Sequence, residues 1–254
     1  MTAEEVPALA FAAVLMAARV GGALMLLPGL GEPEVPPTVR LCLLLALVAL
    51  LMPPLSPALP ALPAAVPELA RLVATESLIG VFLGLLARVS VLAMAQAGQV
   101  AALMIGLSSP LQTDAVFGGQ ATATGRLFGL LAAVLVFNTG LYALPLEALA
   151  ESYSVLPPGE GLPLGKGAEA VAGAVAASLA LALKLAAPLV LGAMLAQIAL
   201  GLVARLAPNL QIYAVAGAGQ ILAGLLLLAL VLPALVPVWA AAVQEAFLHP
   251  MELR

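Results

Sequence analysis

The sequence predicts an all-α protein that is integral to a membrane or closely associated with one. Hydrophobic residues make up 64% of the 254 residues and charged residues only 9%, whereas soluble domains are about half apolar and about a quarter charged. The mean hydropathy of +1.18 also exceeds what a soluble core can bury. About six apolar runs recur along the chain, and about 20 apolar residues suffice to span a bilayer as a helix.

The first apolar run covers residues 6–28 and is expected to be a retained helix. Its start, MTAEEVP, is acidic where a secretory signal is basic, and Arg19 interrupts the apolar stretch. A shorter run at 41–52 lies between two proline-rich segments, LPGLGEPEVPP and MPPLSPALPALPAAVP. Proline lacks the amide donor that a helix needs, so both segments are expected to be extended loops. A third such segment, ESYSVLPPGEGLPLGKGAE, is expected at a water-accessible edge.

The remaining runs are longer than one membrane crossing requires. The third, 72–107, would measure over about 50 Å as a single helix against a hydrocarbon core of about 30 Å, so it must bend or leave the bilayer. Runs at 127–150, 170–206 and 210–247 follow. The last two hold prolines at which a kink or break is expected: Pro188, Pro233 and Pro237. Long kinked helices and hairpins in a single domain, residues 1–254, are the expected architecture.

Residues for catalysis or metal binding are sparse. The only histidine is His249, near the C-terminus; the only cysteine, Cys42, lies inside an apolar run; and Asp114 is the only aspartate. The sequence has no carboxylate pair, phosphate-binding loop or dinucleotide fingerprint. It therefore predicts no enzyme, no metal site and no cofactor. A net charge of -4 without any basic cluster also argues against a nucleic acid partner.

Several charges fall inside apolar runs, among them Glu76, Arg88, Glu147 and Lys184. A charge that faces lipid at the bilayer centre is costly, so each must have a partner or lie near water. These residues could belong to an ion path, to buried interfaces or to a water-exposed edge. Glu76 and Arg88 are too far apart in sequence to be helical neighbours. We expect each of these two to be an interface charge that pairs across an interface.

Glycines four residues apart, Gly80 with Gly84 and Gly125 with Gly129, have the spacing that lets two helices approach closely. The chain holds 23 glycines, so such spacings also arise by chance. They indicate tight helix packing without identifying the partner helix.

The stretch GLSSPLQTDAVFGGQATATG, residues 106–125, places glycines, hydroxyls, amides and Asp114 between two long apolar runs. A connection this long is uncommon between packed helices unless it is mobile or functional. It is equally compatible with an ordinary solvent loop, because Gly, Ser, Thr and Asp are common loop residues. Composition alone leaves both interpretations open.

Three stretches together resemble the FliR family of flagellar export proteins and its relative in virulence secretion, the SctT family. The first is ARVGGALMLLPGLGEPEVPPTVRLCLLLALVALLMPP, in which Arg19, Pro28, Pro36 and Arg40 are placed as in the N-terminal pattern of the family. The second is ESLIGVFLGLLARVSVLAMAQAGQVAALMIGLSSPLQTD with FNTGLYALPLEALAESYSVLPPG after it, and the third is LGLVARLAPNLQIYAVAGAGQI. Their order and spacing over about 200 residues make the resemblance specific, although each stretch alone is weak. The chain departs from the family pattern at Leu141, Tyr142, Asn209 and Gln211.

The resemblance implies an all-helical, non-enzymatic subunit of a protein export gate in the bacterial inner membrane, at the flagellar basal body. Its implied partners are FliP-like, FliQ-like and FlhB-like proteins, and unfolded export substrates that pass through the centre of a cone-shaped assembly. A secondary transporter of small solutes is the alternative, because transporters also use broken helices. Transporters commonly show repeated halves, however, and no internal repeat is visible here.

The resemblance also implies that the central stretch lies inside the pore and helps to close it. The expected plug comprises Leu107, Ser108, Val116, Phe117, Gly118, Gly119 and Gln120. In this hypothesis Val116 and Phe117 close the pore by excluding water. Gly118 and Gly119 permit backbone conformations closed to other residues, so the plug can yield.

Overall fold

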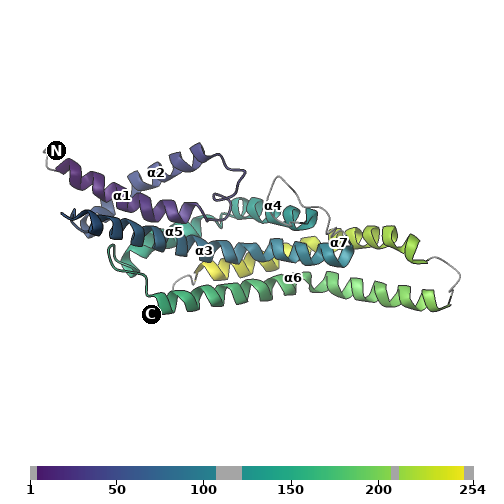
Figure 1. The fold of residues 1–254 in the computed structure, drawn as a ribbon. Coiled ribbons are helices and arrows are strands. Elements are labelled where there is room, and N and C mark those ends of the chain that lie inside the picture. The colour runs from purple at the N-terminus through teal and green to yellow at the C-terminus, as the bar shows by residue number, and fades with distance from the viewer. Residues whose placement is uncertain (1–4, 107–121, 207–211, 249–254) are drawn as a thin grey trace. The chain divides into compact units, whose positions relative to one another are not determined.

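The computed structural model describes residues 5–106, 122–206 and 212–248. These residues form seven α-helices and one short 3-10 helix, and no strand occurs among them, so the all-α prediction is confirmed. Their order can be followed by colour in Figure 1. The helices are α1 (Glu5–Leu24), α2 (Pro37–Leu55), α3 (Val66–Ile105), α4 (Ala123–Asn138), α5 (Ala143–Val155), α6 (Leu164–Leu206) and α7 (Ile212–Leu248).

Five of these helices are long and apolar enough to cross a membrane: α1, α2, α3, α6 and α7. Helices α4 and α5 pass the same test only as a pair, and the pair is bent by 71° at the break between them. The sequence run at 127–150 had given no sign of this break. Gly140 lies in it with φ +75, a backbone conformation that favours glycine. The prediction of a helical membrane protein is confirmed.

Proline interrupts the helices less than the sequence predicts. Helix α2 continues through Pro53 and Pro54 and is followed by the 3-10 helix Ser56–Ala58, so the expected extended loop is wrong for these first residues. Helix α6 likewise continues through Pro188, and α7 continues through both of its internal prolines, so no break occurs at these positions. A kink at these prolines stays a prediction. A proline removes one amide donor, and the remaining turns of a long helix can hold it together.

Backbone contacts divide the chain into two compact units. Unit 1 comprises Met1–Ser90, Val136–Val175 and Gln244–Arg254, and unit 2 comprises Val91–Leu135 and Ala176–Val243. The long helices α3, α6 and α7 contribute residues to both units.

In unit 1, helix α1 packs on α2 and along the first part of α3. Phe11 and Leu15 form a buried cluster with Leu72. Further along both helices, Gly80 lies against the backbone of Arg19 so closely that a Cβ atom at position 80 would collide with the Arg19 carbonyl. The residue numbers increase together, so α1 and α3 run parallel. The glycine spacing at Gly80 therefore serves packing within the chain.

In unit 2, helix α4 packs antiparallel on the second part of α3. The Thr124 hydroxyl donates to the Gly98 carbonyl at 2.9 Å. A Cβ atom at Gly129 would lie 3.7 Å from the Cβ of Ala95, while one at Gly125 would lie 2.7 Å from the Gln99 side chain. The glycine spacing at Gly125 thus brings α4 close to α3 of the same chain.

Helices α6 and α7 form an antiparallel hairpin in unit 2. The Gln197 amide donates to the Gln220 side-chain oxygen at 3.3 Å. Further from the connection, Gly192 lies directly against the Leu227 side chain. Trp239 is fully buried in the same unit. Hairpins are part of the architecture expected from the sequence, which had not assigned one to these two helices.

Candidate functional site

The most buried polar site of the described chain is an ion pair in unit 1. Arg19 lies in α1 and Glu76 lies in α3, and neither residue has solvent-exposed surface. The Arg19 Nε–H donates to Glu76 Oε2 at 2.6 Å. The two side chains meet because α1 and α3 approach closely, next to Gly80.

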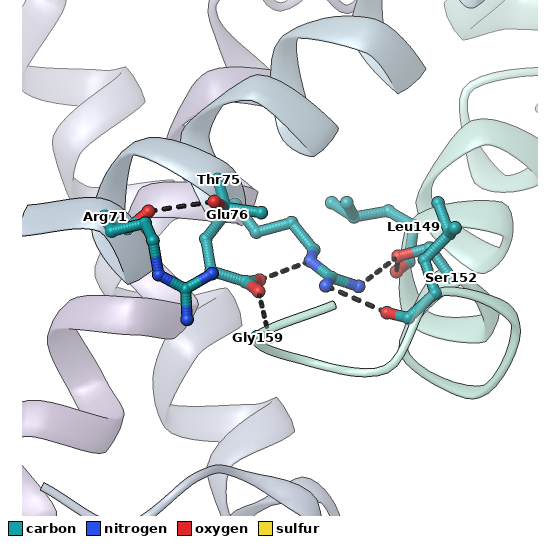
Figure 2. Close-up of polar contacts among 8 residues, drawn as sticks. Arg71, Thr75, Glu76, Leu149, Ser152 and Gly159 are labelled. Atoms are coloured by element: carbon teal, nitrogen blue, oxygen red, sulfur yellow. Dashed lines mark hydrogen bonds and ion pairs between the residues drawn. The ribbon is translucent and has the colours of Figure 1, made fainter. Parts of the chain in front are cut away.

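Arg19 also binds helix α5 with its remaining donors. One terminal nitrogen donates to the Ser152 hydroxyl at 3.2 Å, and the other donates to the Leu156 carbonyl at 3.0 Å. The guanidinium lies over the Tyr153 ring, 4.2 Å from its centroid, in a cation–π contact. The dashed lines in Figure 2 trace the polar contacts between Glu76, Ser152 and their neighbours. One arginine therefore holds α3, α5 and the residue that follows α5.

Glu76 fixes the turn between α5 and α6 with its second oxygen. The Gly159 amide donates to Glu76 Oε1 at 3.1 Å, as Figure 2 shows. Within the turn, the Glu160 amide donates to the Pro157 carbonyl at 3.1 Å, and Gly159 has φ +91. Glycine follows Pro158 in the position where a type II turn requires positive φ. The sequence PPGE thus specifies the turn, and Glu76 holds it in place.

This arrangement satisfies a charge pair that would otherwise be costly to bury. Buried ions lose their hydration, and only good geometry with further hydrogen bonds compensates for that loss. Arg19 uses its Nε and both terminal nitrogens, and both carboxylate oxygens of Glu76 accept a hydrogen bond. The Ser152 hydroxyl accepts from Arg19 and donates to the Leu149 carbonyl at 2.6 Å. The contacts of the cluster thereby join three helices and a turn.

A second pair in unit 1 is more exposed. Arg88 in α3 lies 3.4 Å from the Glu32 carboxylate, with 26% and 29% of the two side chains exposed. Arg40, in the first turns of α2, donates to the backbone carbonyl of Glu32. The two arginines therefore hold the loop between α1 and α2. Water screens this pair, so it contributes less than the buried one.

The other two charges that the sequence places inside apolar runs lie at the surface of the chain. Glu147 in α5 and Lys184 in α6 are both exposed. Glu76 and Arg88 each find a partner within the chain, so neither needs another subunit to be paired. Whether they also contact a neighbouring subunit stays a prediction.

Sequence reasoning did not assign Arg19 as the partner of Glu76. Arg19 stood out only as a charge that interrupts the first apolar run. The available signal was a single arginine in the first apolar run and a glutamate in the third, since buried charges of opposite sign tend to pair. Nothing in the spacing of 57 residues indicated that these two would meet.

The predicted plug, Leu107, Ser108, Val116, Phe117, Gly118, Gly119 and Gln120, lies outside the described residues, as does Asp114. Before it, α3 ends at Ile105 and Gly106 takes φ +84. After it, α4 begins at Ala123. Within the described ranges, no group of three or more His, Cys, Asp or Glu side chains could hold a metal ion.

Comparison with known proteins relates most of the chain to one family. The sequence model described as "Bacterial export proteins, family 1" matches residues 10–246. Over 235 residues, the chain is 31% identical to the flagellar biosynthetic protein FliR of Caulobacter vibrioides, a match that covers 92% of this chain and 94% of the relative. The likeness therefore extends over both chains and is not confined to one shared segment.

Proposed function

The chain belongs to family 1 of the bacterial export proteins, and we propose that it is a structural, pore-forming subunit of a flagellar or related type III protein export gate. In this proposal it acts in the bacterial inner membrane, at the flagellar basal body. It assembles with FliP-like and FliQ-like subunits, contacts an FlhB-like protein and passes unfolded export substrates. The observation that carries the proposal is the family match over nearly the whole chain.

The fold supports a structural role over an enzymatic one. Its most buried polar residues, Arg19 and Glu76, are used to join helices. Helices α3, α6 and α7 have 40, 43 and 37 residues, and each exceeds the roughly 20 residues that one bilayer crossing needs. The excess length suits an assembly that extends beyond the bilayer. We propose that the whole chain, 1–254, acts as one subunit.

We further propose that residues 107–120 close the passage when no substrate occupies it. Val116 and Phe117 supply the apolar constriction, and Gly118 and Gly119 let it yield. Two observations support this role: the stretch is polar and glycine-rich between apolar runs, and α3 and α4 flank it in the chain.

Deleting the gene in its host tests the proposal. The deletion should abolish export of flagellar or virulence proteins into the medium, and the intact gene supplied in trans should restore it. Uptake of small solutes should be unchanged. Normal export together with a lost solute uptake would favour the alternative of a secondary transporter. Co-expression with the FliP-like and FliQ-like proteins of the same bacterium tests the proposed assembly, which should purify as one complex.

A further inference from the structure

Helix α5 has one buried face and one charged, exposed face. The buried residues follow helical spacing: Leu149, Ser152 and Tyr153, with Leu156 directly after the helix. The exposed polar residues Glu147, Glu151 and Ser154 also follow helical spacing, and Val155 is exposed beside Ser154. We call the three polar residues the acidic face of α5.

The contacts of Arg19 fix which face is exposed. Arg19 donates to the Ser152 hydroxyl and stacks over the Tyr153 ring, both on the buried face. A rotation of α5 that buried Glu151 would break both contacts and would leave the Arg19–Glu76 pair less well satisfied. The exposure of the acidic face is therefore built into the fold of unit 1.

The two glutamates of the acidic face have no ion-pair partner among the described residues. The ion pairs found there join Arg19 to Glu76, and two further arginines to Glu32 and Glu68. Glu147 and Glu151 are one turn apart, so their like charges also repel each other weakly. An unpaired carboxylate that faces hydrocarbon is strongly disfavoured, and here two would face it together.

Helix α5 is also short for a membrane crossing. Its 13 residues correspond to about 20 Å, while a hydrocarbon core measures about 30 Å. The bent α4–α5 pair passes a test of length and hydropathy for a sixth span. Within this pair, however, both carboxylates of α5 lie on one exposed face.

We propose that the acidic face of α5 meets water in the membrane-embedded protein and that α5 is not a lipid-facing span. A water-filled space or a water surface then lies beside α5, opposite the Arg19–Glu76 pair. This inference does not depend on the proposed export function, because it follows from the charges and from the contacts that orient the helix.

Cysteine labelling in native membranes tests the proposal. The wild-type chain has a single cysteine, Cys42, exposed on the apolar α2. In a Cys42→Ala background, Glu151→Cys and Ser154→Cys are each treated with a charged, membrane-impermeant maleimide in sonicated membranes open to both sides. Maleimide reacts with the thiolate, which forms in water and is suppressed in apolar surroundings, so both positions should react at least about tenfold faster than the apolar references.

The references are Cys42 in the wild-type chain and Leu45→Cys, also exposed on α2. Leu149→Cys, on the buried face of α5, should react only after denaturation. If a variant is lost from the membranes, Glu147→Cys replaces it. Labelling at positions 151 and 154 as slow as at the references would overturn the proposal. So would labelling that becomes fast only after the chain is separated from other subunits, because protein and not water would then cover the face.

Discussion

Removing one partner of the Arg19–Glu76 pair should destabilise the protein far more than removing both. Arg19→Leu leaves the Glu76 carboxylate buried without its cation, and Glu76→Leu leaves the guanidinium without its anion. Breaking a buried pair in this way typically costs about 3–5 kcal/mol, whereas replacing both charges by apolar residues is often close to neutral. For a chain of this size the single changes correspond to a fall in midpoint temperature of roughly 6–20 °C.

The exposed pair of Arg71 and Glu68 provides a matched control in the same helix. Its atoms lie 3.0 Å apart, but 59% and 53% of the two side chains are exposed. Arg71→Leu should therefore change the stability by less than about 1 kcal/mol. Arg19→Lys should be intermediate, because it keeps the charge but cannot reach Glu76, Ser152 and the Leu156 carbonyl together.

The protein, carrying a fluorescent tag, is expressed together with the FliP-like and FliQ-like proteins. Membranes from these cells are heated and solubilised in detergent, and the tagged chain is then followed by size-exclusion chromatography. The midpoint temperature at which the monodisperse peak disappears measures the stability of each variant. The reasoning is refuted if Arg19→Leu and Glu76→Leu shift this temperature no more than Arg71→Leu does. It is also refuted if the double variant is as unstable as the worse single variant.

Four further outcomes are expected. Expressed alone, the chain should aggregate or be degraded, because its long apolar helices need partner surfaces; a monodisperse lone chain that ignores FliP-like and FliQ-like proteins would contradict this. Gly80→Leu should abolish the folded protein in the same thermal assay, since a side chain there meets the Arg19 backbone, while Gly173→Leu, with nothing within 4 Å, should be tolerated. Arg88→Leu should lower the yield of purified complex if Arg88 contacts a neighbouring subunit. An unchanged yield would indicate that Arg88 serves only to hold Glu32 in the loop between α1 and α2. Deleting residues 115–120 should leave the complex assembled but let ions leak across the membrane. An ion permeability equal to that of the wild type in a flux assay would indicate that this stretch is an ordinary loop.

The sequence alone determined the all-α fold class and the association of the protein with a membrane. Helices and apolar surface follow from composition and from the length of the apolar runs, which are local properties. The positions of the first and third connections were also readable, because proline and glycine mark them whatever the rest of the chain does. The third is shorter than predicted, because residues 151–155 belong to α5 and residues 164–169 belong to α6. The resemblance to the FliR family was carried by ordered local motifs and needed no coordinates.

Only the tertiary structure decided which distant residues meet. Glu76 contacts Arg19, 57 residues away, and Gly159, 83 residues away, while Arg19 reaches Ser152 across 133 residues. Each apolar run is compatible with many packings, because leucine-rich helices offer little to distinguish one neighbour from another. The choice depends on where glycine lets two backbones approach and on where a buried charge can satisfy all its hydrogen bonds at once. Those conditions involve several segments together, and therefore no single stretch of the sequence expresses them.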